Sequence, residues 1–126
     1  MNTASLDHAA ERFRYLYEAY LKDAGSRVYL SLIPDKNYFM AAPNGYPSID
    51  YEQFAEELQS RTGYMQYIDI FDLLELEDYY RTDAHWRQEK ILDVAARLAG
   101  GMGVELTGSY TRKTLEKPFY GVYYGQ

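Results

Sequence analysis

The stretch Arg27-Val28-Tyr29-Leu30-Ser31-Leu32-Ile33 decides the fold class, because it places apolar side chains on both alternating faces of an extended chain. Such a run is typical of a strand that helices cover on both sides of a parallel sheet. Pro34 then ends the run. A second strand-like run at residues 65–70 follows a predicted helix, so strand, helix and strand form one right-handed crossover unit. We therefore predict an α/β fold with a parallel sheet flanked by helices.

Three amphipathic helices are predicted around these strands. The first spans residues 6–24 and can end at Gly25, and the second starts with Asp50 as its N-cap. The third follows His85 and ends at Gly100-Gly101. Its apolar face is formed by Ile91, Leu92, Ala95, Leu98 and Ala99.

Two segments lack a clear helical or strand period. Residues 35–48 contain Pro43, Pro47 and an Asn-Gly pair, so we expect a long loop at the carboxyl edge of the sheet, where open α/β folds place ligands. Lys36 in this loop could contribute to a site or only pair with a nearby acid. From Val104 onward the chain is aromatic and broken by glycines, and an edge strand is predicted at Val122-Tyr123-Tyr124.

The best candidate for catalysis is Asp83 with His85, one of the two histidines of the chain. An imidazole titrates near physiological pH, so it can take and return a proton in one catalytic cycle. A carboxylate beside it fixes the ring tautomer and stabilises the imidazolium. The pair is expected just before a helix N-terminus, whose dipole would keep Asp83 ionised. Alternatively, Asp83 only caps that helix.

The sequence around this pair resembles the DHHW family of bacterial envelope proteins. Asp83 begins an Asp-x-His-Trp sequence that follows a Tyr-Arg-Thr run and precedes a predicted helix. Ile33-Pro34-Asp35-Lys36 is similar to the Pro-x-Lys of the family, and Phe119–Tyr124 is similar to its Gly-x-Tyr-Tyr segment. Ala84 stands where the family name records a histidine, but that middle position varies among related acetyltransferase-like proteins.

The resemblance implies an SGNH hydrolase-like (flavodoxin-like) domain, related to the O-acetyltransferase-like proteins of alginate biosynthesis, where an Asp-x-His pair works with a serine. It implies that residues 1–126 form one such domain, cut short before the nucleophile, because no Asp-Ser-aromatic motif occurs before Gln126.

The implied reaction is acyl transfer or ester hydrolysis on an envelope glycan. His85 would be the general base and Asp83 its orienting acid, while Tyr80, Trp86 and Lys36 would contact the substrate. The alternative is a non-catalytic carbohydrate- or protein-binding module of the bacterial surface, in which the Asp–His pair is structural.

Composition narrows the remaining classes. The 126 residues suit one domain, and the absence of cysteine excludes disulfides and a thiol nucleophile. A net charge of -6 argues against nucleic acid and against an anionic membrane surface as partners. Fifteen tyrosines could stack on sugars, although packing is their commoner use. The N-terminus lacks the basic and apolar regions of a signal peptide, so an exported parent protein would carry its targeting segment elsewhere.

No cofactor or metal is expected. Metal binding needs three or four convergent ligands, whereas Asp83 and His85 supply two and His8 is far away in sequence. Gly-rich phosphate-binding loops are absent from the sequence. No serine lies in a Gly-x-Ser-x-Gly elbow, and Ser109 is best interpreted as an ordinary turn residue.

Overall fold

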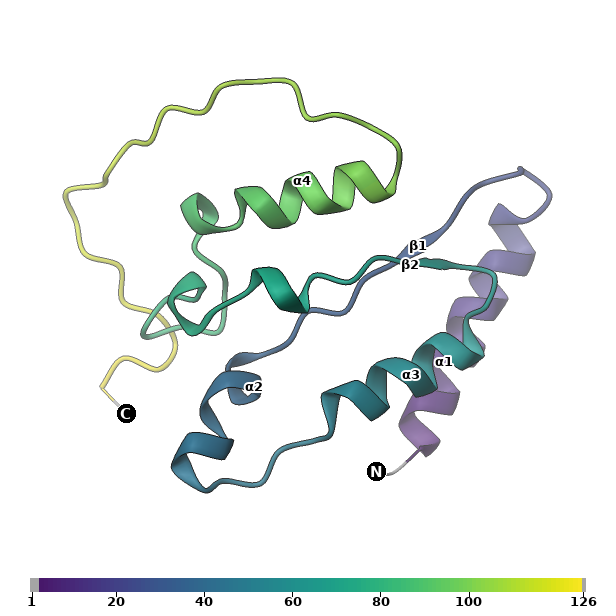
Figure 1. Cartoon of the computed structure of the whole chain (residues 1–126), viewed down its shortest axis with the longest axis horizontal. Helices are drawn as coiled ribbons and strands as arrows, with labels where there is room; N and C mark the ends of the chain where they lie inside the picture. The colour runs from purple at the N-terminus through teal and green to yellow at the C-terminus, as the bar shows by residue number, and fades with distance from the viewer. Residues whose placement is uncertain (1–2, 126) are drawn as a thin grey trace.

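The computed structural model describes residues 3–125 and has a mixed helix and sheet architecture (Figure 1). Two very short strands lie side by side at its centre, and helices precede, connect and follow them. The helices are α1 (Ala4–Leu16), α2 (Lys36–Met40), α3 (Tyr51–Arg61) and α4 (Leu92–Gly101), and the strands are β1 (Tyr29–Leu30) and β2 (Gln66–Tyr67).

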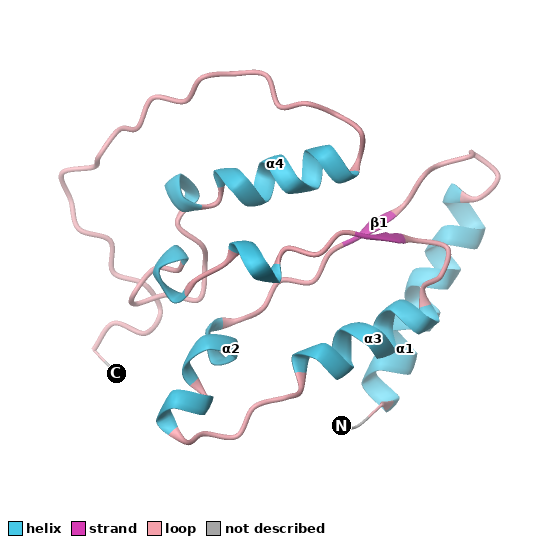
Figure 2. Cartoon of the chain, in the orientation of Figure 1, coloured by secondary structure: helices cyan, strands magenta, loops and turns pink. Residues whose placement is uncertain are grey.

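The predicted parallel crossover unit is confirmed. Tyr29 pairs with Gln66 in parallel register, and α2 and α3 lie in the connection between the two strands. The α/β class is therefore confirmed in its coarse form. Both strands are much shorter than the predicted runs (Figure 2). The Ile68 amide still donates to the Leu30 carbonyl at 2.9 Å, and beyond that bond the Ser31 hydroxyl donates to the Ile68 carbonyl at 2.9 Å.

Helices lie on both sides of the strand pair. Figure 1 shows α4 on one side and α1 with α3 on the other. The backbone of α4 closely approaches Ile68, since a Cβ added at Gly101 would lie 2.6 Å from Ile68 Cδ1. On the opposite side, Arg61 at the end of α3 forms an ion pair with Asp7 of α1 at 2.7 Å. The predicted covering of the strand on both faces fails at its end, where Ile33 is 61% exposed.

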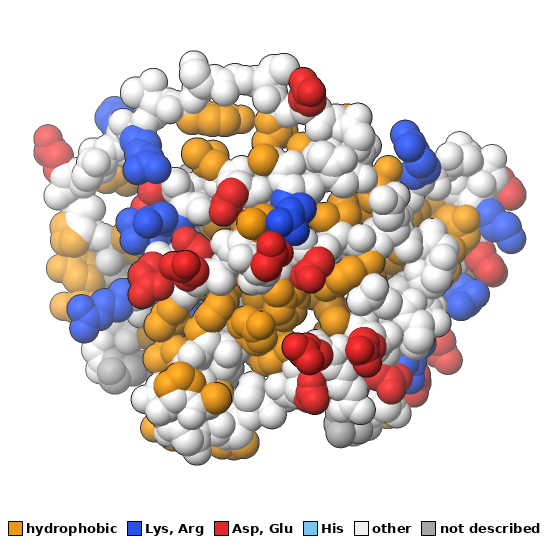
Figure 3. Space-filling view, viewed as in Figure 1, with side chains coloured by type: hydrophobic (Ala, Val, Ile, Leu, Met, Phe, Trp, Pro, Cys, Tyr) orange, Lys and Arg blue, Asp and Glu red, His pale blue; other side chains and the backbone are white. Residues whose placement is uncertain are grey.

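The central apolar cluster joins the segment after β2 to α4. Its buried members are Ile70, Leu74 and Val94, and Trp86 packs against them from the segment of the Asp–His pair. Figure 3 shows that apolar side chains also reach the surface across the middle of one face. The core therefore directly supports the residues next to the candidate site.

The predicted helices are confirmed with changes at their ends. α1 continues as a π-helical turn at Tyr17–Leu21, and Gly25 follows with a φ of 66°. Asp50 caps α3 as predicted, accepting a hydrogen bond from the Gln53 amide at 2.9 Å. The loop predicted at 35–48 instead contains α2, because the Asp35 carboxylate caps it by accepting from the Asn37 amide at 2.8 Å.

The edge strand predicted at residues 122–124 is wrong. Residues 104–125 contain neither helix nor strand, and they run from α4 in a wide arc back to the segment near residue 82 (Figures 1 and 2). A turn replaces the strand, since the Tyr124 amide donates to the Gly121 carbonyl at 3.1 Å. Within the part of the chain that is described, no helix combines the length and apolar character needed to cross a membrane.

Replacing Ile70 with alanine tests the central cluster. Ile70 is 1% exposed, so Ile70→Ala should lower the free energy of unfolding by about 2–5 kcal/mol through lost burial and a residual cavity. Urea unfolding measures this change. Ile33→Ala, at a 61% exposed position, is the control and should change stability by about 0.5 kcal/mol or less. Equal losses in the two variants would contradict this assignment of the core.

Candidate active site

A short hairpin-like loop presents the Asp–His pair. Tyr79 and Trp86 form an antiparallel bridge at its base, and the Tyr80 amide donates to the His85 carbonyl at 3.0 Å. Both base residues are anchored, because the Tyr79 hydroxyl donates to the Pro34 carbonyl while Trp86 packs on the core. We call Asp83 and His85 the dyad, and residues 80–85 the dyad loop.

Asp83 and His85 contact each other as predicted. Asp83 Oδ1 accepts a hydrogen bond from the His85 amide at 2.9 Å, and His85 Nδ1 is hydrogen-bonded to the same oxygen. Asp83 is 4% exposed, whereas the His85 side chain is 85% exposed. An ionised carboxylate only accepts hydrogen bonds, so Nδ1 carries the proton and Nε2 is available on the exposed side.

Local hydrogen bonds keep Asp83 ionised. The pKa of Asp83 is lowered to about 2, first by the His85 ring and then by the backbone amides of His85 and Val122, and burial opposes this shift. The Val122 amide lies 3.2 Å from Asp83 Oδ2. The predicted helix-dipole cause is wrong, because α4 begins only at Leu92. The capping alternative is also wrong, because Ile91 occupies the N-cap position of α4.

An open pocket of about 680 Å³ lies at the dyad. Tyr80 and Trp86 line it, as the sequence predicted, and the Tyr80 ring lies 4.8 Å from the Phe119 ring between centroids. None of the described residues that line this pocket is a serine. Sequence reasoning missed Ile33, Gln88 and Phe119 as further lining residues. In the sequence, Phe119 stood out only as part of the segment at residues 119–124 that resembles the DHHW family. Sequence spacing alone did not place Phe119 next to Tyr80.

Lys36 lies behind the dyad loop. Its ammonium group donates to the Tyr80 carbonyl and, at 3.3 Å, to the Arg81 carbonyl. It also lies 5.9 Å from the centroid of the Tyr123 ring. Burial lowers the pKa of Lys36, and the negative charge of Asp83 partly offsets this. Lys36 was predicted to contact the substrate. In the structure its ammonium group instead binds the backbone of the dyad loop.

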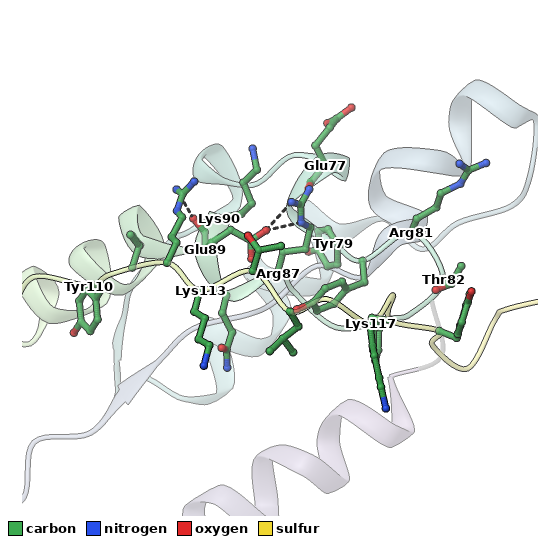
Figure 4. A pocket seen from close by; sticks show the side chains of 18 of the residues that line it. Glu77, Tyr79, Arg81, Thr82, Arg87, Glu89, Lys90, Tyr110, Lys113 and Lys117 are labelled. Carbon is green, nitrogen blue, oxygen red and sulfur yellow. Dashed lines mark hydrogen bonds and ion pairs between the residues drawn. The ribbon is translucent and has the colours of Figure 1, made fainter.

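A second, larger cavity of about 1330 Å³ adjoins the dyad pocket (Figure 4). The two share Tyr80, Gln88 and Phe119 as lining residues. Arg87 is ion-paired with Glu89 at 2.6 Å, whereas the separate side chains of Lys113 and Lys117 both point away from this pair (Figure 4). The aromatic lining consists of Tyr79, Tyr80, Tyr110, Phe119, Tyr120 and Tyr124.

Comparison with protein-family models, with curated proteins and with solved structures found no match to this chain. Within residues 3–125, no group of three or more His, Asp or Glu side chains is arranged to hold a metal ion. His8 is exposed on α1.

Asp83→Asn should reduce the dependence of stability on acid pH. The folded-state pKa of Asp83, about 2, is below its ordinary value of 3.8. The unfolded chain therefore takes up this proton first, so the stabilisation is present above about pH 4 and is lost as pH falls through about 2. Urea unfolding at stepped pH measures the slope. Asp23→Asn is the control at an exposed position, and an equal slope in both variants would contradict the special environment of Asp83.

Lys36→Met should loosen the dyad loop. The substitution keeps an apolar stem but removes the donor for the Tyr80 and Arg81 carbonyls, at a cost of about 1–2 kcal/mol. Urea midpoints would be compared with those of Lys22→Met, an exposed lysine outside the site. If the two variants unfold at the same midpoint, Lys36 does not anchor the loop.

Proposed function

We propose that this chain carries the Asp–His part of a serine-dependent acyl-ester hydrolase or O-acetyltransferase in a DHHW-type, SGNH-like protein of the bacterial cell envelope. The observation that carries this proposal is an exposed His85 imidazole whose Nδ1 is hydrogen-bonded to the buried, ionised Asp83. The parallel β1–β2 pair with helices on both sides is compatible with the flavodoxin-like sheet of such a domain.

His85 acts as the general base in this site. Its Nε2 removes the proton from a serine hydroxyl as the oxygen attacks the acyl carbonyl, and Asp83 stabilises the imidazolium that forms. His85 then returns the proton to the departing sugar oxygen. In hydrolysis, water then attacks the acyl-serine, His85 takes the proton of the water and returns it to the serine oxygen as the acyl–serine bond breaks, and in transfer a second hydroxyl takes the place of water. In this proposal the serine comes from outside residues 1–126, and none of the described residues that line the dyad pocket is a serine.

The aromatic surroundings support a glycan as the acyl carrier. Tyr80 and Phe119 line both cavities, so a sugar chain in the larger cavity would reach the dyad. Tyrosine rings combine an apolar face with a hydroxyl, which suits a surface that must stack on a sugar and hydrogen-bond to it. Trp86 forms one wall of the dyad pocket beside His85.

A non-catalytic binding module is the second candidate. The cavity of about 1330 Å³ is lined by several aromatic residues, and neither Asp83 nor His85 is among its lining residues. It could therefore hold a saccharide without any acyl chemistry. In that case Asp83 and His85 only hold the loop together. Loss of thermal stability in Asp83→Ala and His85→Ala, without any change in parent activity, would favour this function.

Esterase and acetyltransferase assays of the parent protein test the dyad. Relative to wild type, His85→Ala should lower kcat/KM for an aryl acetate on the order of 10³-fold or more, because the general base is lost. His8→Ala, on the exposed side of α1, is the matched control and should keep full activity. Unchanged parent activity in His85→Ala would contradict the catalytic role.

The isolated chain should turn over acetyl esters little or not at all, since it lacks the nucleophile and oxyanion donors in this scheme. Robust turnover that is lost in His85→Ala would show that the serine lies within residues 1–126.

The reading frame after codon 126 gives an independent check. An Asp-Ser-aromatic motif after a predicted strand would support the proposal, and a stop codon would contradict it.

A further inference from the structure

Residues 119–124, which we call the C-terminal strap, lie against the dyad loop. The Gly121 amide donates to the Thr82 hydroxyl at 3.1 Å, and the Tyr123 amide donates to the Thr82 carbonyl at 2.9 Å. Between them, the Val122 amide donates to Asp83 Oδ2 at 3.2 Å. Consecutive backbone amides of the strap therefore hold consecutive residues of the loop.

Only glycine fits at the centre of this contact. A Cβ added at position 121 would lie 2.6 Å from Asp83 Oδ2 and would also clash with the Thr82 carbonyl oxygen. Backbone and a buried carboxylate cannot move aside as the end of a flexible side chain can. The close approach of the strap to Asp83 thus depends on the missing side chain of Gly121.

The side chains of the strap reinforce its position. Phe119 packs on Tyr80 at the start of the loop, with ring centroids 4.8 Å apart. The Tyr123 ring lies 5.9 Å from the Lys36 ammonium group, which also donates to the Tyr80 and Arg81 carbonyls. The strap and Lys36 therefore hold the dyad loop together.

We propose that Gly121 and Val122 are positioning residues for the Asp83–His85 pair. The Val122 amide holds Oδ2, which fixes the rotation of the carboxylate and directs Oδ1 to His85 Nδ1. Asp83 is 4% exposed, so water does not readily replace a lost donor. This inference rests on the proposed function for its catalytic meaning, although the contact itself is testable without any turnover.

Val122→Pro and Val122→Ala separate the amide from the side chain. Proline removes the N–H that donates to Asp83, whereas alanine keeps it and shortens a side chain that is 67% exposed. Val122 is the second residue of the turn that the Tyr124 amide closes onto the Gly121 carbonyl. Proline is favoured at that position of a turn, and the described non-glycine residues all have negative φ, so the turn itself tolerates the substitution. The proline Cδ takes the place of the N–H that points at Asp83 Oδ2, so the substitution removes the donor and also pushes the carboxylate out of its present orientation.

The readout is the titration of the Asp83 carboxyl carbon by NMR. Wild type and Val122→Ala should share a pKa of about 2, while in Val122→Pro and Gly121→Ala the pKa should rise by roughly half a unit or more toward 3.8. His85 and Lys36, the titratable groups that face Asp83, are unchanged in all these variants. An unchanged Asp83 pKa in a folded Val122→Pro would overturn the inference.

A second measurement needs no substitution near the site. In the wild-type chain the amide proton of Val122 should shift with pH at the same midpoint as the Asp83 carboxyl, because the two groups share a hydrogen bond. If the chemical shift of the Val122 amide proton does not change at that midpoint, the inference is overturned even if the variants fail to fold. If the Val122 amide follows the Asp83 titration but the parent protein has no acyl-transfer activity, only the proposed function is contradicted. If the parent protein is active but the Val122 amide does not follow that titration, only the positioning role is contradicted.

Discussion

The hydrogen bonds that the buried Asp83 carboxylate accepts are the constraint on which the arrangement of this site depends. A charge removed from water is costly unless its oxygens find donors, and here the donors come from two separate segments. His85 provides its ring and its amide, and Val122 provides its amide from the end of a long irregular segment. Satisfying one carboxylate therefore fixes both the orientation of His85 and the position of residues 119–124.

The rest of the fold keeps this loop in place with little regular structure. The sheet consists of two very short strands within the described residues, so side-chain and loop contacts have a large part in the architecture. Trp86 joins the loop to the cluster around Ile70 and Val94, and the buried Tyr79 joins it to the chain just after β1. His85 thus stays exposed on a loop whose base is held by the core.

Sequence reasoning predicted the features that depend on local pattern. The parallel crossover and the capped start of α3 follow from apolar periodicity and from Asp50, and the contact of Asp83 with His85 follows from a two-residue spacing. It failed where distant segments meet. The contact of Val122 with Asp83 spans 39 residues, and no local period encodes it. The low pKa of Asp83 agrees with the predicted ionisation but not with its predicted cause, because the His85 ring, followed by the backbone amides of His85 and Val122, takes the place of the expected helix dipole.

The proposed role of Asp83 is to orient His85 as a general base, and the tautomer of the neutral His85 ring reports on this role without any substrate. The ¹⁵N chemical shifts of the ring nitrogens can be measured in the isolated chain at a pH where the imidazole is neutral. We expect a proton on Nδ1, directed at Asp83, and an unprotonated Nε2 facing the pocket. A ring protonated on Nε2, or an even mixture of the two tautomers, would contradict it.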